Sequence, residues 1–213
     1  MPTTRKPVLT CPARLSYAHV FKPRKNDLNG NMEYSAVLLI PKDVTKNHPP
    51  QIELKDNAGD IKMLQEAIKE AAVEKWAAQA KGYKIPLKDG DKELNSEGIA
   101  KAPGFWMLSV MSYAEEQDGS PREAPMVKDA RNVPINDSYG WVSGDWGRAK
   151  VFFAPYDTSG NKGVKAYLNA LQWLYKDEPF GAARDDEFDV VEDGQAATSA
   201  GPSADEYDPF ADE

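Results

Sequence analysis

The sequence has little of the residues on which most catalytic and metal sites depend. Cys11 is the only cysteine in 213 residues, so an internal disulfide is impossible and a thiolate-rich zinc site is excluded. His19 and His48 are the only histidines, and no second histidine or acidic cluster stands at metal-ligand spacing from His19. The sequence therefore predicts no metal site and no cofactor, and it leaves little material for histidine-based catalysis.

Sequence patterns of nucleotide-binding and hydrolytic enzymes are also absent. Phosphate-loop, dinucleotide-binding and nucleophile-elbow glycine patterns do not occur. Glu115 and Glu116 form a carboxylate pair, but they stand in a polar turn, where solvated acids are the norm. No compact carboxylate cluster for magnesium is evident. We therefore expect a protein that is not an enzyme, with a nuclease as the third-ranked alternative.

Long apolar segments are missing too. No run of eighteen apolar residues occurs, so the sequence predicts no transmembrane helix. The first residues, MPTTRKPVLTCPA, lack the apolar stretch of a signal peptide. We expect a soluble, cytoplasmic protein without a membrane partner.

The net charge of -8 is distributed unevenly along the chain. Residues 177–213 contain thirteen acids and the single base Arg184, which leaves 25 bases and 21 acids in residues 1–176. A body of charge +4 is thus followed by a tail of charge -12. The spacer GQAATSAGPSA within the tail has too few apolar residues to form a core. We expect a folded domain over residues 1–176 and a disordered acidic tail over residues 177–213.

Residues 147–175 give the clearest structural signal, two strand-like runs joined by the turn sequence DTSGN. Side chains alternate between the two faces of a strand, which predicts one cationic and aromatic face and one core face. The first face comprises Arg148, Lys150, Phe152, Tyr156, Lys165, Tyr167 and Asn169. The core face comprises Ala149, Val151, Phe153, Val164, Ala166, Leu168 and Ala170. The first face suits single-stranded nucleic acid, although an ordinary amphipathic hairpin with solvated lysines fits the same pattern.

The rest of the body predicts further strands and one helix. Residues 15–21 and 32–40 form a hairpin around a turn at Asn29-Gly30, and residues 105–113 form another strand with Leu108 and Val110 on the core side. Apolar residues at helical spacing predict a helix over residues 60–81. Together with a short strand near residue 127, these elements predict a mainly β fold compatible with a small Greek-key barrel such as the OB-fold.

Four stretches of the body carry a resemblance to a known family. They are Leu15-Ser16-Tyr17, Leu39-Ile40-Pro41-Lys42, Tyr139-Gly140-Trp141, and Gly163-Val164 through Leu168 to Leu171-Gln172. In order and spacing they resemble phage-encoded single-stranded DNA-binding proteins over nearly the whole body. The resemblance implies an OB-fold core that coats single-stranded DNA during phage replication and recombination, in the host cytoplasm. More distantly, the layout is similar to the phage T7 helix-destabilising protein and to bacterial single-strand-binding proteins, whose acidic tails end in an aromatic residue.

The sequence departs from the pattern of these proteins at two places. Phe210 stands three residues before the last residue instead of at the end. The predicted helix follows the second strand, whereas the usual OB order has it between the third and fourth strands. We therefore expect a barrel with an inserted helix.

Single-stranded DNA would be held by cationic side chains at phosphates and by rings stacked on bases, with little sequence preference. The cationic candidates are Arg14, Lys22, Arg24, Arg148, Lys150 and Lys165. The stacking candidates are Tyr17, Trp106, Trp146, Phe152 and Tyr167. An RNA-binding OB module remains an alternative, because the contacts to the 2′-hydroxyl that distinguish RNA from DNA cannot be identified in the sequence.

The tail suggests two further roles. Its acids can compete with DNA for the basic body, and its exposed rings suit an apolar pocket of a replication or recombination protein. The residues predicted to bind such a partner are Tyr207, Asp208, Phe210 and Asp212. A merely solubilising tail is one alternative, and an adaptor that uses the tail as a DNA mimic without binding nucleic acid is another. The sequence leaves self-association open.

Overall fold

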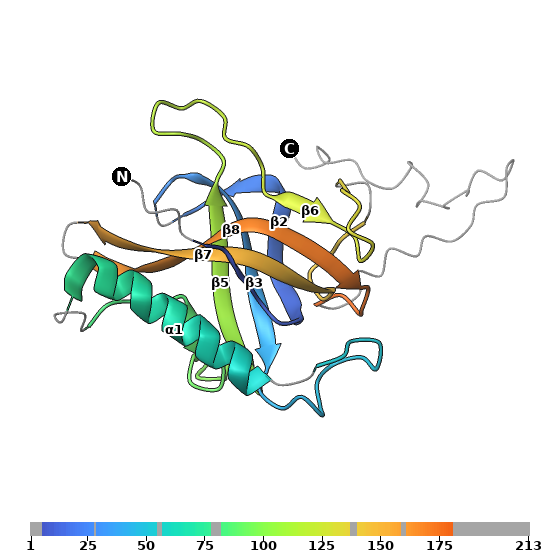
Figure 1. The fold of residues 1–213 in the computed structure, drawn as a ribbon. Helices are drawn as coiled ribbons and strands as arrows, with labels where there is room; N and C mark the ends of the chain where they lie inside the picture. The colour runs from blue at the N-terminus through green and yellow to red at the C-terminus, as the bar shows by residue number, and fades with distance from the viewer. Residues whose placement is uncertain are drawn as a thin grey trace, which may run out of the picture. The chain divides into compact units, whose positions relative to one another are not determined.

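The computed structural model describes residues 6–27, 29–54, 57–77, 82–136, 140–158 and 161–180. Within these residues eight strands and one helix form a mainly β structure, as predicted (Figure 1). None of the described helical residues belongs to a helix that is long and apolar enough to cross a membrane. The predicted tail residues 181–213 lie outside the described residues.

The elements follow one another along the chain with both long and very short strands. They are β1 (Val8–Leu9), β2 (Ala13–Lys25), β3 (Met32–Pro41), α1 (Asn57–Trp76), β4 (Leu87–Asp89), β5 (Phe105–Tyr113), β6 (Met126–Lys128), β7 (Trp146–Thr158) and β8 (Asn161–Tyr175). The two predicted hairpins and the strand over residues 105–113 are confirmed. The short strand predicted near residue 127 is β6. Neither β1 nor β4 was predicted, because two or three residues in a polar or proline-rich stretch show no alternating pattern.

The five long strands form a closed cycle of hydrogen-bonded pairs. Pairing runs from β2 to β3, β5, β8 and β7, and β7 returns to β2 where Ala13 pairs with Gly147. All neighbours in this cycle are antiparallel except β5 and β8, which run parallel. The short strands β1, β6 and β4 extend β7, β8 and β5 respectively.

A β-bulge in β8 changes which side chains face outward. Val151 pairs with Leu168 and Lys150 pairs with Ala170, so Asn169 has no partner on β7. The alternation of faces therefore reverses at Asn169, and Leu171 becomes a core residue. The prediction that Ala170 belongs to the core face is wrong, because Ala170 lies opposite the outward-facing Lys150.

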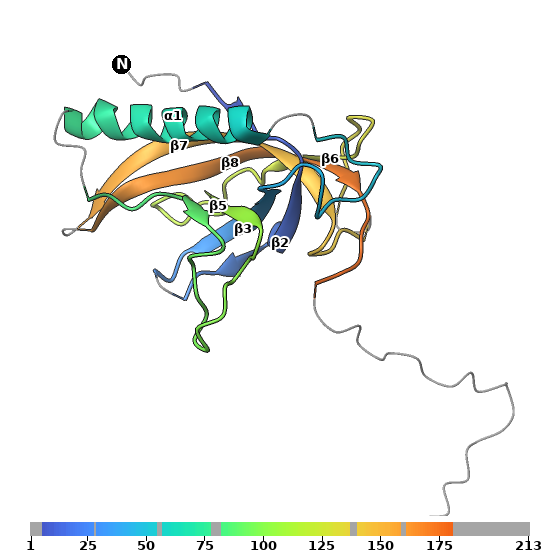
Figure 2. The same ribbon diagram turned by 90° about the horizontal axis from the view of Figure 1, so that it is seen from below.

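Helix α1 packs along β7 and β8 (Figure 2). The residues that it buries against them are Ile61, Leu64, Ile68, Ala71 and Ala72. At its first residue, the Asn57 side-chain amide donates to the carbonyl oxygen of Pro41, which ties the helix to the end of β3. The predicted inserted helix is confirmed, although it begins three residues earlier than expected and ends at Trp76.

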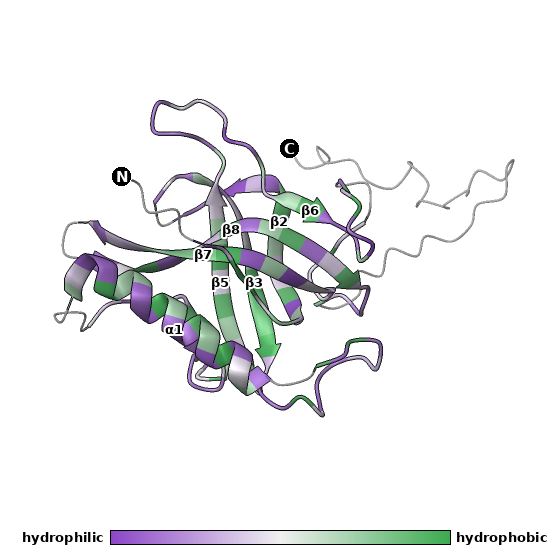
Figure 3. Ribbon diagram, viewed as in Figure 1, coloured by the Kyte–Doolittle hydropathy of each residue, from purple (hydrophilic) through white to green (hydrophobic). Residues whose placement is uncertain are grey.

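The core lies between α1 and the inner faces of the long strands. Hydrophilic and hydrophobic residues alternate along β7 and β8 (Figure 3). The inward set is almost fully enclosed and includes Leu15, Leu38, Ile40, Leu108 and Val151. Each such side chain contributes roughly 1.5 to 3 kcal/mol by leaving water. This packed layer holds in place those side chains of β5, β7 and β8 that point away from the core.

Candidate nucleic-acid interface

Four aromatic rings gather on the outer face of β5, β7 and β8. Phe152 and Tyr167 pair across the hairpin, and their rings are stacked with centroids 5.2 Å apart at 12°. The Tyr113 ring of β5 lies 6.1 Å from that of Tyr167. With Tyr156 of β7, these residues form what we call the aromatic cluster. All four are partly exposed, so their rings remain accessible from solvent.

Lys165 lies among these rings and supplies a positive charge. Its ammonium donates to the Tyr113 hydroxyl at 2.8 Å and lies 5.2 Å and 5.4 Å from the ring centroids of Tyr113 and Tyr156. Burial acts to lower the pKa of Lys165, but the hydrogen bond to Tyr113 and nearby negative groups outweigh it, so the pKa is raised. Burial raises the pKa of Tyr167. The cluster thus offers aromatic rings around one ammonium group.

A first groove, of about 1320 Å³, lies between the outer face of β7 and β8 and the segment that follows β5. Its floor contains a row across four strands, in which Leu9, Lys150, Ala170 and Met126 are successive neighbours. Leu9 and Met126 are unusually exposed for apolar residues, at 43% and 51%. The row therefore presents apolar surface on both sides of a lysine.

Gln172 of β8 joins the floor of the first groove to its wall. Its side-chain oxygen accepts a hydrogen bond from Arg148 at 2.9 Å, and its nitrogen donates to the carbonyl oxygen of Asp129 at 3.0 Å. The Asp129 carboxylate in turn accepts the backbone N–H groups of Arg131 and Val133. These hydrogen bonds lower the pKa of Asp129 and hold the wall in a compact turn.

A second groove, of about 990 Å³, lies over β3 and β5 between the tips of the β2–β3 and β7–β8 hairpins. Tyr17 enters it from a bulge in β2, where the register shifts between Ser16 and His19. The backbone of Tyr17 has a φ of 49°, which is rare for a residue with a large side chain, and the residue is 71% exposed. The bulge therefore turns this ring outward into the groove.

Charges lining the grooves are mostly positive. Each groove has five basic and two acidic residues among its described lining residues. In the second groove both acids are engaged: Glu33 accepts hydrogen bonds from two asparagine side chains, and Asp27 lies 3.9 Å from Arg24. In the first groove, Glu116 pairs with Arg122 at 3.0 Å. Both grooves thus favour an anionic ligand.

The structure brings seven of the eleven predicted DNA-binding residues to these grooves. Arg148, Lys150, Phe152 and Tyr167 line the first groove, and Tyr17, Arg24 and Lys165 line the second. The predicted partner-binding residues of the tail lie outside the described residues: Tyr207, Asp208, Phe210 and Asp212.

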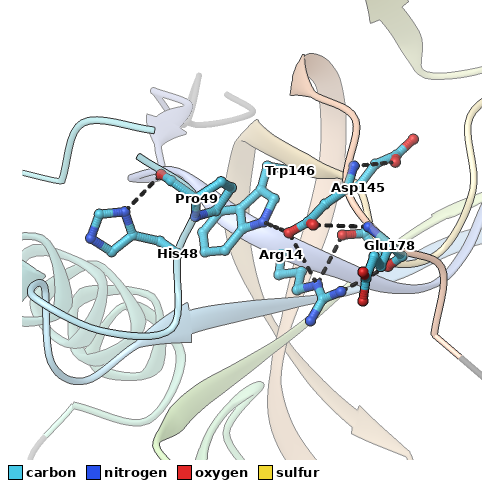
Figure 4. Close-up of polar contacts among 8 residues, drawn as sticks. Arg14, His48, Pro49, Asp145, Trp146 and Glu178 are labelled. Atoms are coloured by element: carbon cyan, nitrogen blue, oxygen red, sulfur yellow. Dashed lines mark hydrogen bonds and ion pairs between the residues drawn. The ribbon is translucent and has the colours of Figure 1, made fainter. Parts of the chain in front are cut away.

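Arg14 and Trp146 hold the end of the described chain instead of facing a groove (Figure 4). The Arg14 guanidinium donates to the carbonyl oxygens of Gly144 at 2.9 Å and Glu178 at 2.7 Å. The Trp146 indole N–H donates to the Asp177 carboxylate at 2.8 Å, and the residue is only 1% exposed. The prediction that Trp146 stacks on bases is wrong, because the core encloses its ring.

Trp106 and Lys22 also lie outside both grooves. Trp106 is on the core side of β5, half-buried, with the Lys42 ammonium 4.9 Å from its ring centroid. Lys22 is exposed on β2. The position of Trp106 does not support stacking on bases, whereas the contact of Lys22 with DNA stays a prediction.

Sequence reasoning missed Tyr113 as a site residue and missed the wall cations Arg122, Lys128 and Arg131. Tyr113 could have been found, since it ends the outward-facing set of β5. The wall cations could not, because long-range contacts place them: β6 pairs with β8, Gln172 bonds the turn at residues 129 and 130, and the Arg122 N–H donates to the Ala114 carbonyl oxygen. Within the described residues, no group of three or more His, Cys, Asp or Glu side chains could hold a metal ion.

Comparisons with known proteins agree with this geometry. The family model of the Enterobacter phage Enc34 single-stranded DNA-binding protein matches residues 6–199. No curated protein matches the sequence. Two solved structures of the bacteriophage Enc34 single-stranded DNA-binding protein are similar. The structure in complex with single-stranded DNA has 20% identity and a TM-score of 0.64, and the match covers 83% of this chain and 90% of that chain. The second has 21% identity and a TM-score of 0.63, and the match covers 85% and 87%.

The fold is also similar to that of gp2.5, the single-stranded DNA-binding protein encoded by bacteriophage T7. The identity is 18% and the TM-score 0.53, and the match covers 91% of this chain and 98% of that chain. At these identities the structural likenesses establish the fold alone, whereas the family model matches most of the sequence. The chain belongs to the phage Enc34 single-stranded DNA-binding protein family.

Proposed function

We propose that this protein binds single-stranded DNA without catalysis and with little sequence preference. The observation that carries the proposal is the aromatic cluster around Lys165, which stands between two cation-lined grooves on one sheet face. Family membership and the likeness to an Enc34 structure in complex with single-stranded DNA support it.

The chemistry of the face fits an unpaired strand. Every base has a π-face, so stacking on Phe152 or Tyr167 would contribute about 1 to 3 kcal/mol per base regardless of sequence. Arg148 and Lys150 would neutralise phosphates beside these rings. In the second groove, Arg24 would neutralise phosphates and Tyr17 would stack on a base. A duplex keeps its bases stacked on one another, and therefore cannot use the rings.

The order of the strands supports an OB-fold. Along the chain, the five long strands β2, β3, β5, β7 and β8 are the first to the fifth. They pair in the cycle first, second, third, fifth, fourth and back to first, and the third (β5) and fifth (β8) run parallel. OB-folds bind oligonucleotides on the face of the second and third strands, between the loops that join the first to the second strand and the fourth to the fifth. The second groove occupies this position.

For the acidic tail we propose two roles. Its acids compete with DNA for the grooves, since tethering keeps their local concentration high. Tyr207 and Phe210, with Asp208 and Asp212, recruit proteins of phage replication or recombination in the cytoplasm of the infected cell.

A competition experiment tests the proposed function. A labelled single-stranded oligonucleotide bound to the full chain is challenged with matched single-stranded DNA, duplex DNA and single-stranded RNA at several salt concentrations. We expect single-stranded DNA to displace the label best and affinity to fall by roughly 0.7 log units per log unit of salt for each phosphate bound. More effective displacement by RNA would favour the RNA-binding alternative, and absence of binding would favour the adaptor.

A further inference from the structure

The two grooves are joined at one side chain. Tyr113 lines both of them, with Tyr167 beside it in the first groove and Lys165 beside it in the second. The Lys165 ammonium donates to the Tyr113 hydroxyl, so the junction consists of a ring and a cation in direct contact. Both are groups that an unpaired strand can contact as it passes from one groove to the other.

Cations continue away from this junction in both directions. In the first groove, Lys128 belongs to β6 and is separated from the stacked rings by the row that contains Lys150. In the second groove, Lys88 of β4 pairs with Met107, which lies six residues before Tyr113 along β5. An extended polyanion would therefore meet positive charge on either side of Tyr113.

We propose that one continuous DNA strand occupies both grooves and crosses from one to the other over Tyr113 and Tyr167. This inference rests on the proposed function and adds the route of the ligand. It extends the binding surface beyond the face of β3 and β5 to the outer face of β7, β8 and β6. A short oligonucleotide then fills the junction, and each added nucleotide extends the bound strand toward Lys88 or Lys128.

The test is a length series of oligothymidylates from about 4 to about 16 nucleotides, the range of site sizes known for OB-folds. Binding is measured for the full chain, Lys88→Ala, Lys128→Ala and the double variant. Lys62→Ala serves as the matched control, because Lys62 is exposed on α1 and outside both grooves. Thermal unfolding of each variant checks that the fold is retained.

We expect one oligonucleotide per protein at every length. Lys88→Ala and Lys128→Ala should each lower the affinity by a factor that is at least threefold larger for the longest oligonucleotide than for the shortest. In the double variant the two factors should multiply. For the longest oligonucleotide, each substitution should also reduce the salt slope by about 0.7. Lys62→Ala should match the unsubstituted chain throughout.

Two results would overturn the continuous route. One is the binding of two short oligonucleotides per protein, with each lysine affecting only one of them, which would indicate separate sites. The other is a loss that is the same at all lengths. Absence of binding at every length would instead contradict the proposed function itself, so the two failures are distinguishable.

Discussion

The guanidinium of Arg14 lies 4.1 Å from the centroid of the Phe180 ring. Arg14 also approaches the Asp177 carboxylate at 3.9 Å, and the N–H of Phe180 donates to the carbonyl oxygen of Ser143. A residue at the start of β2 thus fixes the last described residues of the chain. Gly144 is part of this contact, since a Cβ there would clash with the Glu178 carbonyl oxygen. The side chain predicted to bind phosphate acts as an anchor within the protein.

The Arg14→Ala variant should lose stability and keep its affinity for DNA. The substitution leaves the carbonyl oxygens of Gly144 and Glu178 without their donor, which should lower the free energy of unfolding by roughly 1 to 3 kcal/mol. Urea denaturation measures this change, and titration with single-stranded DNA at a temperature where the variant is folded provides the second reading. Weakened DNA binding at unchanged stability would restore Arg14 as a phosphate contact.

A chain that ends at Phe180 should bind single-stranded DNA more tightly than the full chain. It lacks eleven of the thirteen tail acids but keeps Asp177, Glu178 and the contacts with Arg14. The gain should be larger at about 50 mM than at about 200 mM salt, because screening weakens the competing charges. A second chain that ends at Lys176 should show the same gain and a lower stability. Equal affinities of the full and shortened chains at low salt would contradict competition by the tail.

Replacement of Gln172 by alanine should loosen the wall of the first groove. The side chain accepts from Arg148 and donates to the carbonyl oxygens of Asp129 and Ala130, so its loss detaches this turn from β8. Hydrogen exchange should become faster at the amides of residues 129–135 and stay unchanged along β3. Asn169→Ala, at the exposed bulge residue, is the control. Unchanged exchange in the wall would show that other contacts hold it.

Cys11 should be unreactive in the folded protein. Burial, with a smaller contribution from Asp60, raises the pKa of this thiol to about 12. At pH 8 the thiolate fraction is then on the order of one in ten thousand, and the side chain is enclosed as well. A chromogenic disulfide reagent should label the protein only after a denaturant is added. Rapid labelling without denaturant would show that the segment between β1 and β2 opens readily.

Local patterns sufficed to predict the long strands and the inserted helix. The alternation of Arg148, Lys150 and Phe152 with core residues predicted the outer face of β7 correctly, because the core holds each side chain on the side that the pattern indicates. The same reasoning failed in β8 at Asn169, where one extra residue reverses the alternation. Neither the charge nor the polarity of the neighbouring residues marks this bulge.

The wrong and missed predictions of site residues have a common physical cause. Arg14 and Trp146 are residue types that often contact DNA, but here Arg14 contacts Asp177 and Glu178, and Trp146 donates to Asp177. These partners lie more than thirty residues away in the sequence. Conversely, Tyr113 enters the site because β5 runs parallel to β8 and brings its ring beside Tyr167. The pairing of strands that are distant in the sequence decides which exposed rings and cations share one surface. The alternation of side chains within one β-strand contains no information about that pairing.

The most direct test of the account is the affinity of the Phe152→Ala Tyr167→Ala double variant for single-stranded DNA. The two rings form one stacked platform, so their joint removal should cost about 1 to 3 kcal/mol for each base they engage, or roughly 5-fold to 150-fold in affinity for one base. Phe180→Ala, which removes an exposed ring outside both grooves, is the matched control and should bind like the full chain. An affinity of the folded double variant within twofold of the full chain would contradict DNA binding at this face.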